Sequence, residues 1–279
     1  MNTTQIALAA AMFAGCSAAN AAITCSSVTS PGFTLYYNSA GSTLAQGSFT
    51  VTCSRALATD AASVNYDVNA DNGANAGGGF NGAILGPAKI LYDVYKDSSC
   101  TSAARWKTGG GRISGTITWG ATLGALSQTQ YFWACAPNGQ TGKPVGTYLD
   151  TITMTLTGGS GPNITGSVPV SIQSPALCTV TSPPAALTFD YIAFGAAVNP
   201  ATTFFVNCNS GMAYSLALST ASGTLIGLDY TLSVNTAQQT GSGVAQMQSI
   251  NGAMAAGQAG ICATGTCSAT QAHSLTITY

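Results

Sequence analysis

The sequence has 279 residues, a formal net charge of −1 and only 5% charged residues. Typical soluble proteins carry about 25% charged residues. A chain with so little charge offers no electrostatic footprint for nucleic acid or for an anionic membrane, which excludes both as partners. The seven Lys and Arg residues all lie between Arg55 and Lys143, and all eight acidic residues are Asp.

The residue types favour β-structure throughout the chain after its N-terminus. Thr, Val, Ile and aromatic residues suit pleated, half-buried surfaces, whereas Gly, Asn, Ser and Pro mark turns. We find no amphipathic helix after the N-terminal leader, and the length allows two domains that each bury a core. The sequence therefore predicts an all-β protein.

The N-terminal segment, residues 1–21, is expected to be a secretory signal peptide. An apolar run is followed by small residues, and Ala19-Asn20-Ala21 fits a cleavage site. The alternative is a lipoprotein cleavage site before Cys16. Removal of Cys16 with the leader leaves eight cysteines, an even number that suits an oxidising compartment and favours cleavage after Ala21.

The remaining cysteines divide into two sets of four with matching surroundings. CSSVTSPGFTLYY, from Cys25, resembles CTVTSPPAALTFDY, from Cys178. TITMTL near the end of the first half aligns with SLTITY at the end of the chain, which makes Tyr279 the counterpart of Leu156. This self-similarity predicts two copies of one β-domain, residues 22–173 and residues 174–279.

Spacing alone does not set the disulfide connectivity, because four cysteines allow three pairings. Cys25–Cys53 and Cys178–Cys208 are equivalent by position, and each is expected to join the first two strands of its domain. Cys100–Cys135 and Cys262–Cys267 then follow by elimination. A zinc site is the alternative, but only the last pair is closely spaced and the secretory context favours disulfides. We expect no metal and no cofactor.

The two domains end differently. The first continues into SVPVSIQ, where Val168, Val170 and Ile172 alternate with other residues as in one more strand, and Pro169 suits an edge position. The second ends at Tyr279 without such a segment. The sequence thus predicts a complete N-terminal domain and a C-terminal domain that lacks its last strand.

A strand from another molecule is expected to fill this slot, by backbone pairing and pockets for alternate side chains. Leaving three apolar side chains uncovered costs about 5–9 kcal/mol, which is comparable with the whole stability of a domain. About three residues precede Cys25 after cleavage, too few to donate a strand in return. The chain is therefore expected to accept a strand, to donate none and to sit at the end of a polymer. The expected acceptor groove is lined by Leu187, Phe189, Leu275, Ile277 and Tyr279.

These motifs, above all GQTGKPVGTYLDTITMTL at residues 139–156, resemble the spore coat protein U domain family, in two copies over nearly all of the mature chain. The resemblance implies tandem immunoglobulin-like, pilin-like β-sandwiches, the subunit fold of archaic chaperone–usher pili, and a two-domain tip adhesin. It also implies secretion through the periplasm to the cell surface. The implied partners are a periplasmic pilus chaperone, an outer-membrane usher and an adjacent pilin subunit that donates an N-terminal strand. The second copy departs from the family pattern between Gly241 and Cys267, so the resemblance does not define the positions of its middle strands.

The resemblance further implies attachment to an abiotic or host surface, and biofilm formation, through hydrophobic loop tips of the first domain. Each candidate side chain has the core as its alternative place. The candidates are Phe80, Ile84 and Leu85 in residues 77–87, Trp106 and Ile113 in residues 104–113, and Leu123 in residues 118–126.

Two other functions stay open: a non-tip structural pilin or coat subunit, and a carbohydrate-binding β-sandwich. Catalysis is not expected, because the only histidine, His273, is read as an edge-strand residue facing water. The Gly-rich segments do not lead from a strand into a helix, as a phosphate-binding loop would. We therefore name no catalytic residue.

Overall fold

The computed structural model describes residues 23–38, 41–107, 111–234, 238–263 and 265–279. The expected leader, with its cleavage site at Ala21 and the alternative at Cys16, lies outside the described residues. All but one of the elements are β-strands, which confirms the all-β prediction; the exception is the 3-10 helix η1 (Ser102–Ala104). No described helix has the length and apolar character that crossing a membrane requires.

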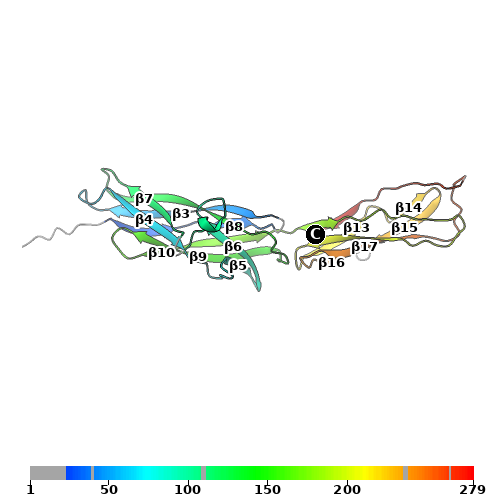
Figure 1. Cartoon of the computed structure of the whole chain (residues 1–279), viewed down its shortest axis with the longest axis horizontal. Coiled ribbons are helices and arrows are strands. Elements are labelled where there is room, and N and C mark those ends of the chain that lie inside the picture. Colours follow the sequence, from blue (N-terminus) through cyan, green and yellow to red (C-terminus); the bar gives the residue numbers. More distant parts are fainter. Residues whose placement is uncertain (1–22, 39–40, 108–110, 235–237, 264) are drawn as a thin grey trace, which may run out of the picture.

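The strands form two β-sandwiches that lie end to end (Figure 1). We call the part built from β1 to β10 the N-terminal sandwich and the part built from β11 to β18 the C-terminal sandwich. The strands of the N-terminal sandwich are β1 (Thr24–Thr29), β2 (Phe33–Tyr36), β3 (Thr43–Arg55), β4 (Ser63–Ala70), β5 (Asn81–Leu85), β6 (Ala88–Tyr95), β7 (Ile113–Thr118), β8 (Gly124–Ala136), β9 (Gly146–Gly158) and β10 (Ile164–Ser174). Those of the C-terminal sandwich are β11 (Cys178–Ser182), β12 (Ala201–Cys208), β13 (Ala213–Leu218), β14 (Ser222–Leu225), β15 (Leu228–Val234), β16 (Gln238–Thr240), β17 (Gln246–Met254) and β18 (Leu275–Thr278).

The two sandwiches share one topology. In the N-terminal sandwich one sheet has the order β1-β3-β8-β6-β5, and the facing sheet has the order β7-β4-β9-β10-β2. The C-terminal sandwich has β11-β12-β17-β15-β14 facing β16-β13-β18. Taken in chain order, each strand of the second set matches one of the first, and among the described strands only β2 and β10 have no counterpart.

Each sandwich encloses its own hydrophobic core, as the alternation of apolar residues along its strands requires. The N-terminal core is the larger and is rich in aromatic residues, among them Phe49, Trp106 and Phe132, all fully buried. The C-terminal core is small and centres on Phe204 and Tyr214. The smaller core agrees with a sandwich that has fewer strands to close it.

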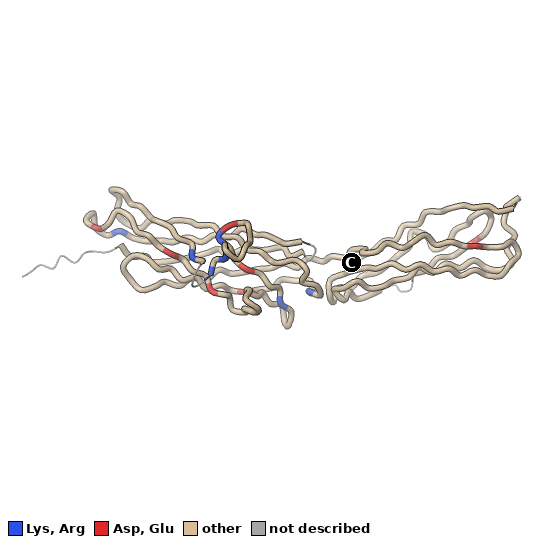
Figure 2. Tube along the Cα trace, in the orientation of Figure 1, with Lys and Arg blue, Asp and Glu red and all other residues tan. Residues whose placement is uncertain are grey.

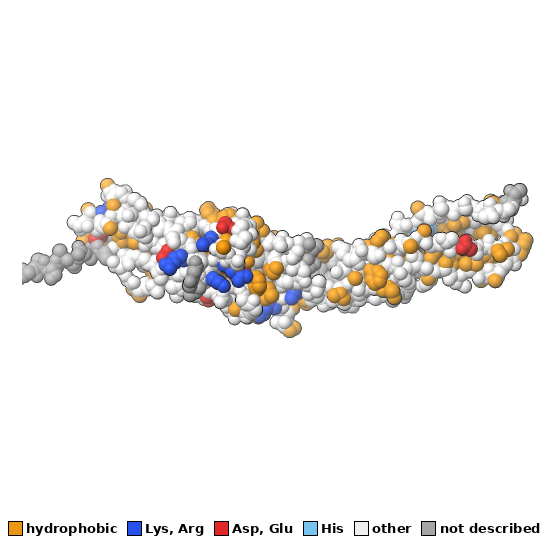
Figure 3. All heavy atoms as spheres, viewed as in Figure 1, with side chains coloured by type: hydrophobic (Ala, Val, Ile, Leu, Met, Phe, Trp, Pro, Cys, Tyr) orange, Lys and Arg blue, Asp and Glu red, His pale blue; other side chains and the backbone are white. Residues whose placement is uncertain are grey.

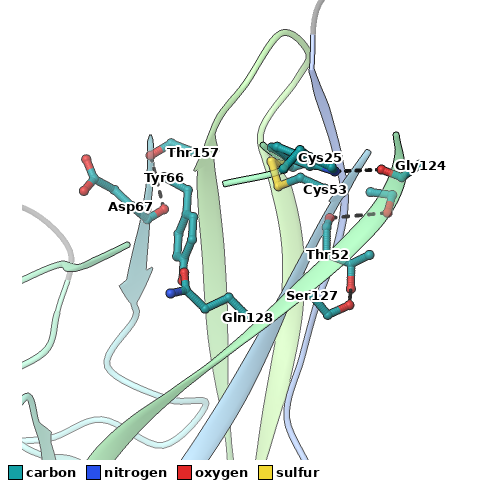
Figure 4. The surroundings of a disulfide bond; sticks show 11 residues. Cys25, Thr52, Cys53, Tyr66, Asp67, Gly124, Ser127, Gln128 and Thr157 are labelled. Atoms are coloured by element: carbon teal, nitrogen blue, oxygen red, sulfur yellow. Dashed lines mark hydrogen bonds between the residues drawn. A yellow bond between two sulfur atoms is a disulfide. The ribbon is translucent and has the colours of Figure 1, made fainter. Parts of the chain in front are cut away.

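Among the described residues there are four disulfides, with the pairing that the repeat suggests. Cys25–Cys53 joins β1 to β3, and Cys178–Cys208 joins β11 to β12 at the matching place. Figure 4 shows the first of these beside the Thr52–Ser127 hydrogen bond, which links β3 to β8. The two cross-strand disulfides hold the first strand of each sandwich to its sheet, and the hydroxyl pair adds a cross-strand contact between β3 and β8.

The expectation that Pro169 lies on an edge strand is wrong. β10 lies between β9 and β2, so it is an internal strand. Its parallel pairing with β2 begins only at Val170, and Pro169 stands just before that point. A proline lacks the N–H that a ladder needs, and here it lies where one of the two ladders has not yet started.

The charged residues are unevenly distributed between the sandwiches. Figure 2 shows Lys and Arg on the N-terminal sandwich only, as the sequence requires, because the last of them is Lys143. The sandwiches meet where the Gly142 N–H donates to the Gly243 carbonyl at 3.3 Å and Asn209 Nδ2 donates to the Lys143 carbonyl at 3.4 Å.

Candidate strand-acceptor site

The strand β10 distinguishes the two sandwiches. In the N-terminal sandwich β10 pairs antiparallel with β9 along its whole length and parallel with β2, so it lies between them. In the C-terminal sandwich β18, the counterpart of β9, pairs with β13, and no described strand pairs with its other edge. The segment that corresponds to β2, residues 183–190, is not a strand. We call the place between β18 and residues 183–190 the open lane.

A glutamine in the loop before the last matched strand fixes the residue correspondence. The Gln140 side chain accepts from the Leu91 N–H at 2.7 Å and donates to the Leu91 carbonyl at 2.9 Å. Gln258 makes the same two bonds with Asp229, at 2.7 and 2.9 Å. Sequence comparison missed this pair, although a Gly-Gln dipeptide precedes a Gly two places on in both copies. The two glutamines make Leu91 and Asp229 equivalent.

The same glutamines identify the residues that flank the lane. The backbone N–H of each donates to a tyrosine hydroxyl, that of Tyr37 at 3.0 Å in one sandwich and that of Tyr191 at 2.8 Å in the other. Counting back two residues from these tyrosines makes Leu35 of β2 equivalent to Phe189. Counting back four makes Phe33 equivalent to Leu187.

A second duplicated hydrogen bond sets the register of β18. The Tyr92 hydroxyl donates to the Asp150 carboxylate at 2.8 Å, and the Tyr230 hydroxyl donates to Gln271 Oε1 at 2.6 Å. Burial raises the pKa of both tyrosines, and the Asp150 charge raises that of Tyr92 further, so both hydroxyls keep the proton that they donate. Because Tyr92 and Tyr230 follow Leu91 and Asp229, this bond makes Asp150 and Gln271 equivalent.

The alignment of the two last strands made from sequence is therefore wrong by two residues. Sequence comparison matches Tyr279 with Leu156, whereas the hydrogen bonds match Tyr279 with Gly158 and Ile277 with Leu156. Side chains alternate along a strand with period two, so a shift of two keeps every side chain on its face. The hydrophobic pattern has no power to detect such a shift.

Equivalent residues on the walls of the lane differ in exposure. Val28 pairs with Val51 in the N-terminal sandwich, and Val180 pairs with Val206 at the matching place. Val28 is 2% exposed and Val180 is 45% exposed. The other wall positions change in the same direction, from buried to partly exposed. They are Phe33 to Leu187, Leu35 to Phe189, Ile152 to His273, Met154 to Leu275 and Leu156 to Ile277.

The structure places the five expected groove residues on the two sides of the lane. Leu275 and Ile277 contact the C-terminal core from β18. Leu187 and Phe189 lie over Gly252 of β17, where a Cβ atom would come within 2.6 and 2.5 Å of their side chains. Tyr279 is 57% exposed and lies one position beyond β18.

His273 does not face water as a free edge residue. Its Nδ1 lies 2.9 Å from Thr220 Oγ1, its Nε2 lies 2.7 Å from the Tyr230 hydroxyl, and its ring meets the Tyr230 ring edge-on. It occupies the place of the buried Ile152 in the other sandwich. Within the described ranges, no three His, Cys or Asp side chains gather as metal ligands.

Two of the candidate loop tips, Trp106 and Ile113, are buried, so for these two the alternative place in the core is the one that the structure shows. Trp106 is fully buried because its ring stacks on Phe49 at 5.1 Å and its Nε1 donates to the Val68 carbonyl at 2.7 Å. Ile113 is 9% exposed because it begins strand β7 and faces the core. Residues 108–110 of this loop lie outside the described residues.

The loop at residues 77–87 lies along the side of the N-terminal sandwich and not at its end (Figure 1). The Phe80 ring lies under the Arg105 guanidinium, 4.6 Å from it, and Leu85 contacts the core. Ile84 is 37% exposed but pairs within the sheet with Leu149 of β9. These three apolar side chains are therefore partly covered by the molecule itself.

Leu123 is the most exposed of the candidates, at 52%, against 37% for Ile84. It lies in residues 119–123, which join β7 to β8 at the end of the N-terminal sandwich farthest from the C-terminal sandwich (Figure 1). Residues 56–62 join β3 to β4 at the same end, and their Leu57 is 48% exposed. Sequence analysis missed Leu57, whose only signal is a run of apolar residues between two strands. We call these two segments the distal loops.

Comparison with known proteins places the sequence in a family. The Spore Coat Protein U domain profile matches residues 2–155, which is more than half of the chain. No curated protein matches the sequence.

Three solved structures are similar to the chain at low sequence identity, each with a TM-score below 0.5. The CsuC–CsuE chaperone–tip adhesion subunit pre-assembly complex of archaic chaperone–usher Csu pili from Acinetobacter baumannii contains a chain 14% identical, with 90% of this chain and 96% of that chain covered and a TM-score of 0.45. The CupB6 tip adhesin from Pseudomonas aeruginosa is 10% identical, with 92% and 94% covered and a TM-score of 0.39. A chaperone–tip adhesin complex of CFA/I fimbriae biogenesis is 8% identical, with 76% and 83% covered and a TM-score of 0.30. On the profile match, this chain belongs to the Spore Coat Protein U domain family.

Proposed function

We propose that this protein is a pilus subunit whose C-terminal sandwich accepts a strand of another polypeptide in the open lane. The observation that carries the proposal is the pair of equivalent residues Val28 and Val180, of which the first is buried and the second is 45% exposed. The two sandwiches match strand for strand except where β10 and its neighbour β2 lie. A strand in the lane would give the second sandwich the cover that the first already has.

The N-terminal sandwich serves as a template for the incoming strand. β10 runs antiparallel to β9 and places Ile164, Gly166 and Val168 opposite Leu156, Met154 and Ile152. By equivalence, a strand in the open lane runs antiparallel to β18. It presents an apolar residue opposite Ile277, a small one opposite Leu275 and an apolar one opposite His273.

The energetic gain favours such a complex. Burying three apolar side chains of an incoming strand, as Val168, Val170 and Ile172 are buried in β10, contributes about 5–9 kcal/mol, at roughly 1.5–3 kcal/mol for each side chain. The backbone N–H and C=O groups on the free edge of β18 gain partners in the same step. An exposed edge of this kind otherwise invites pairing with any other chain, so a cell that secretes the protein needs to cover it.

Within this proposal, a periplasmic chaperone fills the lane first, an outer-membrane usher orders assembly, and the strand of an adjacent pilin replaces that of the chaperone. The N-terminal sandwich already contains β10 and accepts no strand. Its distal loops are then free, which suits a subunit at the tip of a pilus on the cell surface that attaches to surfaces and supports biofilm. The role is structural and adhesive, without catalysis.

A labelled peptide with the sequence of residues 162–174 tests the acceptor function. We expect it to bind the full-length chain in a 1:1 ratio, and we expect Ile277→Asp to abolish binding because that side chain lies on the wall of the lane. The matched control is Thr276→Asp, on the opposite face of β18. Equal binding by all three proteins would contradict the proposal.

Immunogold labelling of pili on the producing bacterium tests the tip position. Gold confined to the ends of the fibres is the expected result. Gold spread along the shaft would instead identify a structural pilin or coat subunit, the alternative function.

A further inference from the structure

Arg55 stands out in the N-terminal sandwich because it is a buried cation without a carboxylate partner. It is the last residue of β3 and is only 5% exposed. The ion pairs among the described residues are Asp93–Arg105 and Asp67–Arg112, and neither includes it. A cation in this position needs strong hydrogen-bond acceptors to offset the loss of water.

Backbone carbonyl groups of the two distal loops supply those acceptors. Arg55 Nη2 donates to the carbonyls of Ala58 at 2.6 Å and of Asp60 at 2.8 Å, both in residues 56–62. Its Nη1 donates to the carbonyls of Gly120 at 2.9 Å and of Thr122 at 3.4 Å, both in residues 119–123. One planar, always charged guanidinium therefore ties both loops to the end of one strand, a geometry that the flexible point charge of Lys reproduces poorly.

Two further hydrogen bonds fix the conformation of the distal loops. The buried carboxylate of Asp60 accepts from the Leu57 N–H at 2.8 Å, which closes a turn within residues 56–62. The Trp119 N–H donates to the Ala62 carbonyl at 2.8 Å and joins the two loops directly. Loops with this many fixed backbone groups have few conformations to lose on contact with a partner.

The outer surface of the distal loops is apolar and without charge. Leu57 and Leu123 are 48% and 52% exposed, and the only charged side chain of either loop, Asp60, is 8% exposed. Figure 3 shows apolar side chains at this end of the N-terminal sandwich. The other exposed residues of the two loops are all Ala, Gly or Thr, so none carries a charge.

We infer that Arg55 is the positioning residue of a contact surface at the distal end, where it holds Leu57 and Leu123 in one arrangement before any partner arrives. The partner is an uncharged apolar surface, because the loops offer no exposed charge for an ionic one. The inference rests on the attachment role proposed above. It adds that the distal loops already have their binding conformation before contact, and do not become ordered only when the partner binds.

Adsorption of the full-length protein to alkyl-coated beads and to hydroxyl-coated beads tests the inference. We expect Arg55→Met to weaken retention on the alkyl beads at least about five-fold, with faster hydrogen exchange at Leu57 and Trp119, and Arg55→Lys to restore it in part. Arg112→Met, which removes an exposed cation of the same sandwich, is the matched control and should bind normally. Normal adsorption of Arg55→Met, with its loops exchanging faster, would overturn the inference.

Two further variants test the loop conformation and the contact surface separately. If Arg55→Met does not fold, Asp60→Ala removes the acceptor of the Leu57 N–H and loosens only the turn of residues 56–62. Unchanged adsorption of that variant would count against preformed loops. The double variant Leu57→Ser, Leu123→Ser tests the surface itself. If it adsorbs as well as the native protein does, attachment through this end fails, independently of the role of Arg55.

Discussion

Gly166 of β10 crosses directly over the backbone carbonyl of Val28 in β1. A Cβ atom built on Gly166 would lie 2.0 Å from the Val28 oxygen, closer than any side chain tolerates. The contact shows how tightly β10 is enclosed between its neighbours and the facing strand. The same closeness is expected wherever a strand fills the open lane beneath Val180.

We therefore expect Gly166→Ala to destabilise the N-terminal sandwich by about 1–3 kcal/mol, because the backbone of β10 or β1 must move. Chemical denaturation followed by tryptophan fluorescence measures this change. Gly41→Ala is the matched control, since no atom lies within 4 Å of a Cβ at that position. Equal midpoints for the two variants would show that β10 has room to shift.

Attaching residues 159–174 directly after Tyr279 should complete the C-terminal sandwich within one chain. The junction follows from the equivalence of Tyr279 with Gly158, after which the N-terminal sandwich continues through a short loop into β10. With about 5–9 kcal/mol gained, the melting temperature of this sandwich should rise by roughly 20 °C or more. Calorimetry of the full chain measures the shift.

The matched control for this fusion carries Asp at the two positions that copy Val168 and Val170. These side chains are 0% and 2% exposed in β10, so charged replacements cannot enter the lane. If the control raises the melting temperature as much as the native graft does, the gain does not come from filling the lane.

Replacing Gln258 by Ala should destabilise the C-terminal sandwich by about 1–3 kcal/mol, because the Asp229 N–H and C=O lose their partners in one step. Gln140→Ala should do the same to the N-terminal sandwich. Gln46→Ala, at an exposed position of β3, is the control and should leave both transitions in place. An unchanged unfolding midpoint for Gln258→Ala would mean that water replaces the side chain without loss.

The Asp67 carboxylate makes the pairing of β4 with β7 dependent on pH. The Ser114 hydroxyl and then the Arg112 guanidinium hold its pKa below the ordinary value of 3.8. Its contribution to stability is thus full above that value and is lost as the pH falls through the lower pKa of the folded state. Asp67→Asn should reduce the acid sensitivity of the unfolding midpoint below about pH 4, whereas Asp190→Asn, at an exposed position, should not.

The strand content and the duplication can be predicted from the sequence, because alternating apolar residues and repeated cysteine surroundings are local signals. The register of β18 cannot, because a shift of two residues leaves the alternation intact. It takes the bonds of Tyr230 and Gln271, which are far apart in the chain, to fix it.

The sequence also does not show which apolar loop residues are exposed and which are buried. Trp106 looks like a loop residue from its neighbours, yet it fills the centre of the core between Phe49 and Phe132. Leu57 is the one leucine in a short run of alanines between two strands, and this run does not indicate whether the leucine is exposed. The bonds of Arg55 to carbonyl groups on both distal loops, together with those of Asp60 and Trp119, show that its loop is held in place.

The covalent attachment of β10 has a consequence for how the two sandwiches respond to dilution. The N-terminal sandwich carries its own closing strand, so its folding equilibrium is unimolecular and does not depend on concentration. Closure of the open lane by another chain follows mass action, and its apparent stability rises with the logarithm of the partner concentration. On the proposed function, one polypeptide thus contains a sandwich whose folding does not depend on concentration and a sandwich whose stability depends on the concentration of its partner strand.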